Sequence, residues 1–130
     1  MKWEIELYTK ANNENPVLDF IESLPAKHRA KVYREIDLLE EFGIDLDYPH
    51  TCDLKGSKNK GLWELRIKFS SNISRIFYFL PEGNKFVLIH GFVKKSNETP
   101  EREIEIARRR KKDYVNRNLK GGDSRELERS

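Results

Sequence analysis

The stretch from Gly61 to Lys95 constrains the fold of this chain more than any other part of its sequence. Its apolar residues fall into three runs, rich in β-branched and aromatic side chains, at positions 62–69, 73–80 and 86–93. Short runs of this kind, bounded by turn residues such as the Pro-Glu-Gly-Asn after the second run, are typical of strands. Because the connections are short, successive strands must lie antiparallel, and the sequence predicts a three-strand meander.

The first half of the chain predicts one strand and two helices. Residues 2–8 alternate between polar and apolar side chains, as in a half-buried strand. Asn15 and Pro16 provide an N-cap and a first helical residue. Leu24-Pro25 interrupts that helix, and a second helix with an apolar stripe follows over residues 26–42.

The segments outside these elements are interpreted as connections and a tail. Gly43 is a natural C-cap, and residues 43–59 are expected to form a long connection with little regular structure. Thr99-Pro100 predicts the start of a last helix with a thin apolar stripe. Residues 119–130 are polar and glycine-rich, which indicates a disordered tail or a segment added to the native protein.

Together these elements predict an α+β fold in a single domain that spans residues 1–118. The chain order is an N-terminal strand, two helices, an antiparallel three-strand meander and a C-terminal helix. The helices of the first half are expected to cover one face of the sheet. Polar side chains are then expected to gather on the other face.

Charge is distributed unevenly along the chain. The first 54 residues hold 6 Lys and Arg against 12 Asp and Glu, a net charge of −6. Residues 55–130 hold 19 against 10, a net charge of +9, and this basic half also contains the meander. A basic surface indicates a polyanionic partner such as nucleic acid. The alternative is that the two halves neutralise each other when the chain folds.

Several classes of protein and site are excluded by composition. Cys52 is the only cysteine, so it forms no intramolecular disulfide, and a neutral thiol is favoured over a nucleophile. No side chains stand at metal-ligand spacing and no glycine-rich phosphate loop is present, so neither a metal nor a cofactor is expected. Without a membrane-spanning apolar run or a secretory signal, we expect a cytoplasmic protein that has no membrane partner.

Arg66 and Arg75 are the strongest candidates for functional residues, because both lie inside predicted strands. Arginine suits phosphate, since its planar guanidinium is permanently charged and donates parallel hydrogen bonds. An unpaired charge is too costly to bury, so Arg75 must reach solvent or pair with an acid, for which Glu64 is one alternative. Lys94 and Lys95 follow at the end of the third strand. For these lysines and Arg66, an ordinary solvated surface is the alternative.

Other basic residues are candidates for binding RNA. They lie in the turn before the meander, on its strands and on the last helix: Lys55, Lys58, Lys68, His90, Arg109 and Lys112. His90 titrates near neutrality and could act as an acid or base, with a histidine satisfied in the core as the alternative. The run at 108–112 could track nucleic acid or be a solvated helix face.

Four segments carry a resemblance to a known family: GLWELRI, SRIFYFL, VLIHGFVKKS and TPEREIEIARRRKKDY. Over roughly residues 3–115 the chain resembles the phage-derived RelE/HigB-like toxins of bacterial type II toxin–antitoxin systems. The combination of two strand arginines, the HGF-x-KK element and a Thr-Pro helix is more specific than any one of these pieces.

The resemblance implies a small α+β fold like that of microbial ribonucleases and an activity as an mRNA interferase acting at the ribosome. It implies that Arg75 matches the family's arginine that contacts the region of the scissile phosphate. It further implies that Arg66 matches the basic residue on the first strand of the meander, and that Lys95, with Lys94, matches the basic residue after the last strand. It also implies a helix-turn-helix antitoxin as partner, through which alone the toxin would meet operator DNA. Several relatives use a tyrosine early in the last helix as an acid or base, whereas residues 96–104 contain none and Tyr114 lies about three turns later.

Cleavage by attack of the RNA 2′-hydroxyl on its neighbouring phosphate needs an aligned nucleophile, charge stabilisation and a proton relay. We expect Arg66 and Arg75 to stabilise charge and Lys94 or Lys95 to transfer a proton. Two alternatives remain at this point. A ParE-like toxin would inhibit gyrase by binding, and a plain nucleic-acid-binding module would account for the charge distribution alone.

Overall fold

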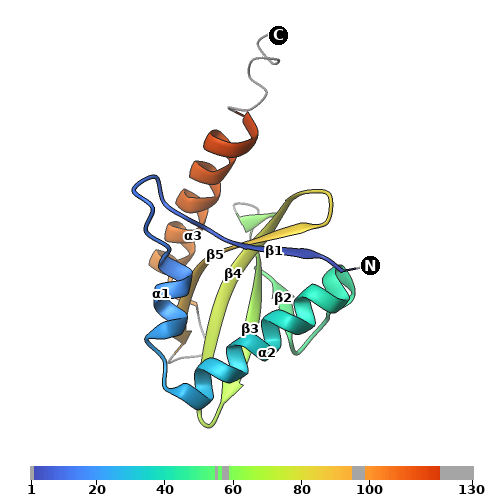
Figure 1. The fold of residues 1–130 in the computed structure, drawn as a ribbon, viewed down its shortest axis with the longest axis vertical. Coiled ribbons are helices and arrows are strands. Elements are labelled where there is room, and N and C mark those ends of the chain that lie inside the picture. Colours follow the sequence, from blue (N-terminus) through green and yellow to red (C-terminus); the bar gives the residue numbers. More distant parts are fainter. Residues whose placement is uncertain (1, 55, 57–58, 95–98, 121–130) are drawn as a thin grey trace.

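The computed structural model describes residues 2–54, 56, 59–94 and 99–120, which form one five-stranded sheet with helices on both faces (Figure 1). The strands lie in the order β1-β5-β4-β3-β2. Their bounds are β1 Glu4–Leu7, β2 Thr51–Asp53, β3 Trp63–Phe69, β4 Asn72–Glu82 and β5 Lys85–Lys94. β3, β4 and β5 pair antiparallel in sequence order, which confirms the predicted meander, and β1 joins β5 in parallel.

The expectation of little regular structure between 43 and 59 is wrong in part. A short 3-10 helix, η1 (Gly43–Asp45), precedes β2, and β2 pairs antiparallel with β3 through Cys52 opposite Glu64. Three residues are too few to show the alternation that predicts a strand. β2 forms because β3 offers it an open edge to pair with.

Helices α1 (Pro16–Glu22) and α2 (Ala26–Phe42) begin and end where the sequence predicts. The side chain of Asn15 accepts a hydrogen bond from the Leu18 N–H at 3.2 Å, which is the expected N-cap. The glycine at position 91 lets α1 approach β5 closely, since a Cβ there would lie 2.5 Å from a ring carbon of Phe20. Gly43, at φ 55°, ends α2.

Each face of the sheet has its own apolar core. The first core lies under α1 and α2 and includes Ile21, Leu39 and Leu65. The second lies under α3 (Glu101–Tyr114), whose residues Ile104 and Ala107 pack with other apolar side chains from β4 and β5. The expectation of a polar second face is therefore wrong for the part that α3 covers. The helix supplies its own apolar stripe and so buries an apolar area of the sheet.

The far end of α3 is held to the N-terminal strand by hydrogen bonds. The hydroxyl of Tyr114 donates to Glu6 Oε1 at 2.8 Å, and that of Tyr8 donates to Asp113 Oδ2 at 2.6 Å. A π-helical turn, η3 (Val115–Lys120), continues from α3. Residues 121–130, most of the predicted tail, lie outside the described residues. These contacts fix α3 along the sheet, and among the described residues no helix covers the part of the second face near the β3–β4 turn.

Candidate nucleic-acid interface

The register of the meander places the predicted cations on one sheet face in two neighbouring rows. Arg66 on β3 lies opposite Arg75 on β4, which in turn lies opposite Phe92 on β5. In the next row, Lys68 and Lys94 flank Ile73. Side chains two residues apart on a strand point to the same face. The strands thus bring together Arg66, Lys68 and Lys94 with Arg75 between them.

Arg75 is buried and forms an ion pair with Glu64, which is the alternative considered for it from the sequence. Its side chain is only 6% exposed and that of Glu64 only 5%. Arg75 Nε and Glu64 Oε1 have no hydrogen-bond partner among the described residues. The ion pair is therefore buried below the more exposed cations. Arg75 can contact a ligand only if its pairing with Glu64 is rearranged.

Cys52 donates its S–H to the same carboxylate, with Sγ 3.2 Å from Glu64 Oε2. Burial, and then the hydrogen bond to Glu64, raises the pKa of the Cys52 thiol to about 11. A thiol with that pKa is neutral at physiological pH and is a poor nucleophile. This contact supports the neutral, partly buried thiol that the sequence favoured.

Arg66 is half-buried and contributes to a basic hollow at the edge of β3. Its guanidinium carbon lies 5.3 Å from the centre of the Tyr48 ring. The pairing of β2 with β3 ends at Leu65. Beyond this point Lys31, from α2, lines the same hollow as Arg66 and Lys68. Lys31 and Tyr48 were not predicted as site residues, since nothing in their local sequence reveals that the fold brings them to β3.

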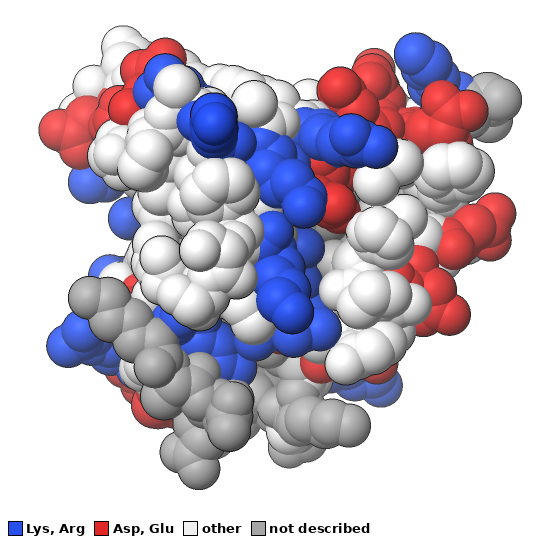
Figure 2. Space-filling model, turned by 90° about the horizontal axis from the view of Figure 1, so that it is seen from below, with Lys and Arg blue, Asp and Glu red and all other residues white. Residues whose placement is uncertain are grey.

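Lys31, Arg66, Lys68 and Lys94 are called the basic band below. Seen from below, Lys and Arg side chains form a continuous strip across the molecule (Figure 2). Lys68 is exposed and Lys94 is half-buried. Burial lowers the pKa of Lys94, and the positive charge of Arg75 lowers it further. The predicted residues Lys55, Lys58 and Lys95 lie outside the described residues.

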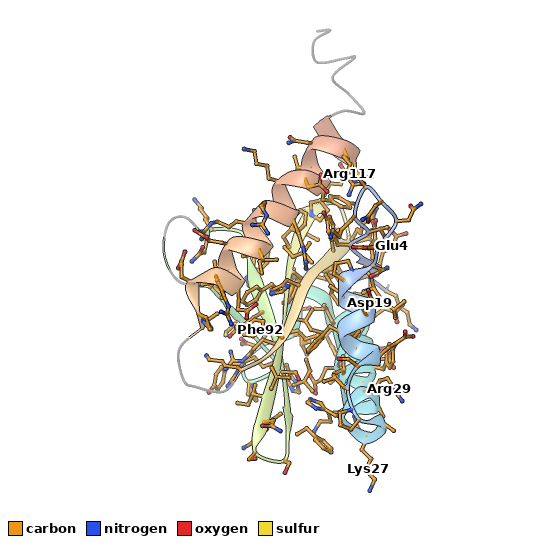
Figure 3. The ribbon with its side chains drawn as sticks, turned by 90° about the vertical axis from the view of Figure 1, so that its left-hand side faces the viewer. Glu4, Asp19, Lys27, Arg29, Phe92 and Arg117 are labelled. Carbon is orange, nitrogen blue, oxygen red and sulfur yellow. The ribbon has the colours of Figure 1, made fainter. Side chains whose placement is uncertain are left out.

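His90 bridges the sheet and α3 instead of facing solvent. Its Nε2 lies 2.6 Å from Glu103 Oε1, and Arg110 donates to its Nδ1 at 3.1 Å. The two contacts are satisfied together by a neutral ring protonated on Nε2. Phe92 stacks on His90 at 5.7 Å, on the α3 side of the sheet (Figure 3). His90 therefore serves as the satisfied histidine that was the alternative from the sequence.

The basic residues 108–112 of α3 do not line the hollow that contains Arg66 and Lys68. Arg109 is exposed and lies by a hollow shared with Tyr8 and Lys10, beside the edge strand β1. Lys112 is exposed on the same helix. Because β1 and β2 are opposite edges of the sheet, Arg109 and Arg66 face different regions of the surface. Tyr114, buried and bonded to Glu6, is not available to replace the tyrosine missing from 96–104.

The described side chains thus form a surface suited to anions and to bases. Cations held on neighbouring strands can neutralise consecutive phosphates of a nucleic acid. Tyr48, 70% exposed, offers a ring face on which an unpaired base can stack. Within the described residues, no group of three or more His, Cys, Asp or Glu is arranged to hold a metal ion. Among those residues, no helix has the length and apolar character needed to cross a membrane.

Loss of Glu64 is expected to destabilise the fold strongly. Glu64→Leu should lower the free energy of unfolding by about 3–5 kcal/mol, because Arg75 is then left charged, buried and unpaired. Urea unfolding followed by circular dichroism measures the effect. The double variant Glu64→Leu/Arg75→Leu is the control and should recover most of the loss, since neither charge remains. A Glu64→Leu variant as stable as the parent would contradict a buried pair.

Acidification is expected to lower stability through His28 and His90. Burial lowers the pKa of both imidazoles in the folded chain. Below about pH 6.5, the ordinary histidine value, the unfolded chain therefore binds more protons than the folded chain, and the free energy of unfolding falls. Urea titrations between about pH 7.5 and pH 5 test this dependence. The variant His28→Gln/His90→Gln should show a flatter profile, and an equally steep one would exclude these histidines as its cause.

Comparison with protein families gives one result and comparison with curated proteins gives none. The model described as Phage derived protein Gp49-like (DUF891) matches residues 19–112, which include all of β2 to β5 and most of α3. This family is a RelE-like toxin family of toxin–antitoxin systems. No curated protein matches the chain significantly.

Proposed function

Since the chain belongs to the phage-derived Gp49-like family, we propose that it is the toxin of a type II toxin–antitoxin system and cleaves mRNA. The observation that carries the nuclease part of this proposal is the pair of cation rows on β3, β4 and β5. Cations fixed to a rigid sheet can hold a phosphate and stabilise charge that develops on it. A cognate antitoxin is the expected partner, and we propose that it carries a helix-turn-helix domain and links the toxin to operator DNA.

The proposed reaction uses the RNA itself as the nucleophile. The 2′-oxygen attacks the adjacent phosphorus, the bond from phosphorus to the 5′-oxygen breaks, and a 2′,3′-cyclic phosphate and a free 5′-hydroxyl result. One group must accept the 2′-hydroxyl proton and another must protonate the leaving oxygen. The phosphorane between these steps carries extra negative charge that nearby cations stabilise.

Arg66 and Lys94 are assigned the direct roles in this mechanism. Arg66 is half-buried and can offer its guanidinium to the phosphate oxygens. Lys94 has a lowered pKa because of burial and Arg75, which is the direction that makes a lysine a better base. Glu64 neutralises Arg75 in the buried pair, so Arg75 is assigned charge stabilisation only once that pair is rearranged. Lys95 is proposed to assist Lys94 in proton transfer.

RNA binding is assigned to residues around this centre. Lys31 and Lys68 can contact flanking phosphates, since they share the hollow with Arg66. Tyr48 can stack a base that is unpaired in single-stranded mRNA. Few of these groups are ideal acids or bases, so we propose that a translating ribosome orders the mRNA for cleavage. Efficient cleavage of naked RNA by the purified toxin would contradict that part of the proposal.

Arg66→Ala is expected to lower mRNA cleavage by about 10²–10³-fold, because a cation facing the phosphorane is lost. The wild type and the variant are induced in bacteria, and new mRNA 5′ ends are mapped. Arg34→Ala, an exposed arginine of α2 outside the hollow, is the matched control and should cleave normally. We choose Arg66 over Arg75 because loss of Arg75 would also leave Glu64 buried without its partner.

Codon-aligned ends with the wild type and the control, but not with Arg66→Ala, would support a translation-dependent nuclease. Growth arrest without any new ends would contradict the nuclease and favour a toxin that binds its target, such as gyrase. Normal cleavage by a folded Arg66→Ala variant would exclude the role assigned to Arg66.

Lys94→Arg separates charge from proton transfer. Arginine keeps the positive charge but does not give up a proton near neutral pH. If Lys94 is the base, single-turnover cleavage by Lys94→Arg should fall by about 10²-fold or more while RNA binding changes little. Cleavage within about threefold of the wild type would show that Lys94 acts through its charge alone.

A further inference from the structure

A second surface of the molecule has the opposite character to the basic band. Residues 35–54 contain seven Asp and Glu and no Lys or Arg. They include the end of α2, η1 and β2, on the right of Figure 2, where acidic side chains gather apart from the band. These carboxylates would repel nucleic acid. Tyr48 and the residues of this range that line the hollow of Arg66 (Glu35, Pro49 and His50) belong to the RNA site, and the RNA function proposed above does not account for the rest of the segment.

Apolar side chains are exposed within this acidic region. Ile44 is 67% exposed and Phe42 is 48% exposed, although both belong to ordered elements. Isolated exposed apolar residues are common, but Ile44 also lines a hollow whose wall includes Leu46 and Trp63. An apolar hollow with large exposed side chains at its rim is typical of a protein-binding surface.

The hollow extends from the edge strand β2 over the face of the sheet that α1 and α2 cover, where Tyr78 and Phe86 also line it. β2 is the terminal strand and is only three residues long, so its outer side faces away from β3. Asp47 and Asp53 line the same hollow, and Asp45 is exposed beside Ile44. A ligand that fills the hollow must therefore bring apolar groups to Ile44 and Trp63 and positive charge to the aspartates. A segment of protein that is both apolar and cationic meets both requirements.

We propose that this acidic–apolar hollow is the docking site of the antitoxin, which inserts a segment of apolar and Lys- or Arg-rich sequence beside β2. The identity of the partner rests on the proposed function, while the chemistry of its segment rests on the hollow alone. The hollow and the basic band are separate, so the antitoxin holds the toxin through a surface that does not bind RNA.

The test uses the full chain and the product of the open reading frame next to its gene, co-expressed and co-purified. The first variant is Asp47→Lys/Asp53→Lys, which reverses two exposed charges that line the hollow, and the second is Ile44→Ser, which removes the apolar contact. The control is Asp19→Lys/Glu22→Lys, an equal reversal of two exposed charges on α1, of which Figure 3 labels Asp19. None of these side chains belongs to the RNA site.

Both hollow variants should bind the neighbouring gene product at least about tenfold more weakly than the wild type, as measured by titration calorimetry. The control should bind normally, and affinity for the wild type should fall with added salt. In cells, the hollow variants should arrest growth even when the antitoxin is present. If the hollow variants bind and are neutralised like the wild type, the docking site is overturned and the toxin function stands.

A chain that binds the neighbouring protein through the hollow but neither arrests growth nor cleaves mRNA would overturn the proposed function and leave the docking surface. Self-association of the chain alone, abolished by the hollow variants in sedimentation experiments, would assign the surface to a second copy and overturn the proposal. Failure of the wild-type chain to bind the neighbouring product would overturn it as well.

Discussion

The buried ion pair between Arg75 and Glu64 is the interaction on which the candidate site depends. Arg66 and Arg75 lie directly opposite each other on β3 and β4, where two unpaired positive charges would repel each other. Glu64, two residues before Arg66 on the same strand, neutralises the buried partner. The sheet can therefore hold a second arginine and the two lysines of the next row close to that buried charge, at the cost of desolvating one charge pair.

The placement of α3 decides how much of this face remains polar. Its apolar stripe covers the part of the face that carries Phe77 and Phe79, and its far end is fixed to Glu6 by Tyr114. His90 forms hydrogen bonds with Glu103 and Arg110 of α3. These contacts lie where the part of the sheet face covered by α3 ends. One side of the meander is thus divided into a core and a basic surface.

The separation of charge along the sequence survives folding, although not as a simple division into halves. Lys31, from the acidic half, joins the basic hollow, because α2 passes the open edge of β3. The acidic surface instead comes from the end of α2 and the segment that leads into β2. In our interpretation, the separation gives one surface for RNA and one for the antitoxin. A toxin that must bind both benefits from keeping the two surfaces distinct.

Local sequence determined the meander, the two helix starts and the strand positions of Arg66 and Arg75, because turn residues, capping side chains and apolar periodicity act over a few residues. Only the tertiary structure decided what those elements meet. β2 formed because β3 offered an open edge, α3 buried a face expected to be polar, and Glu64 rather than solvent became the partner of Arg75. These outcomes depend on contacts between residues distant in sequence, and no local pattern encodes such contacts.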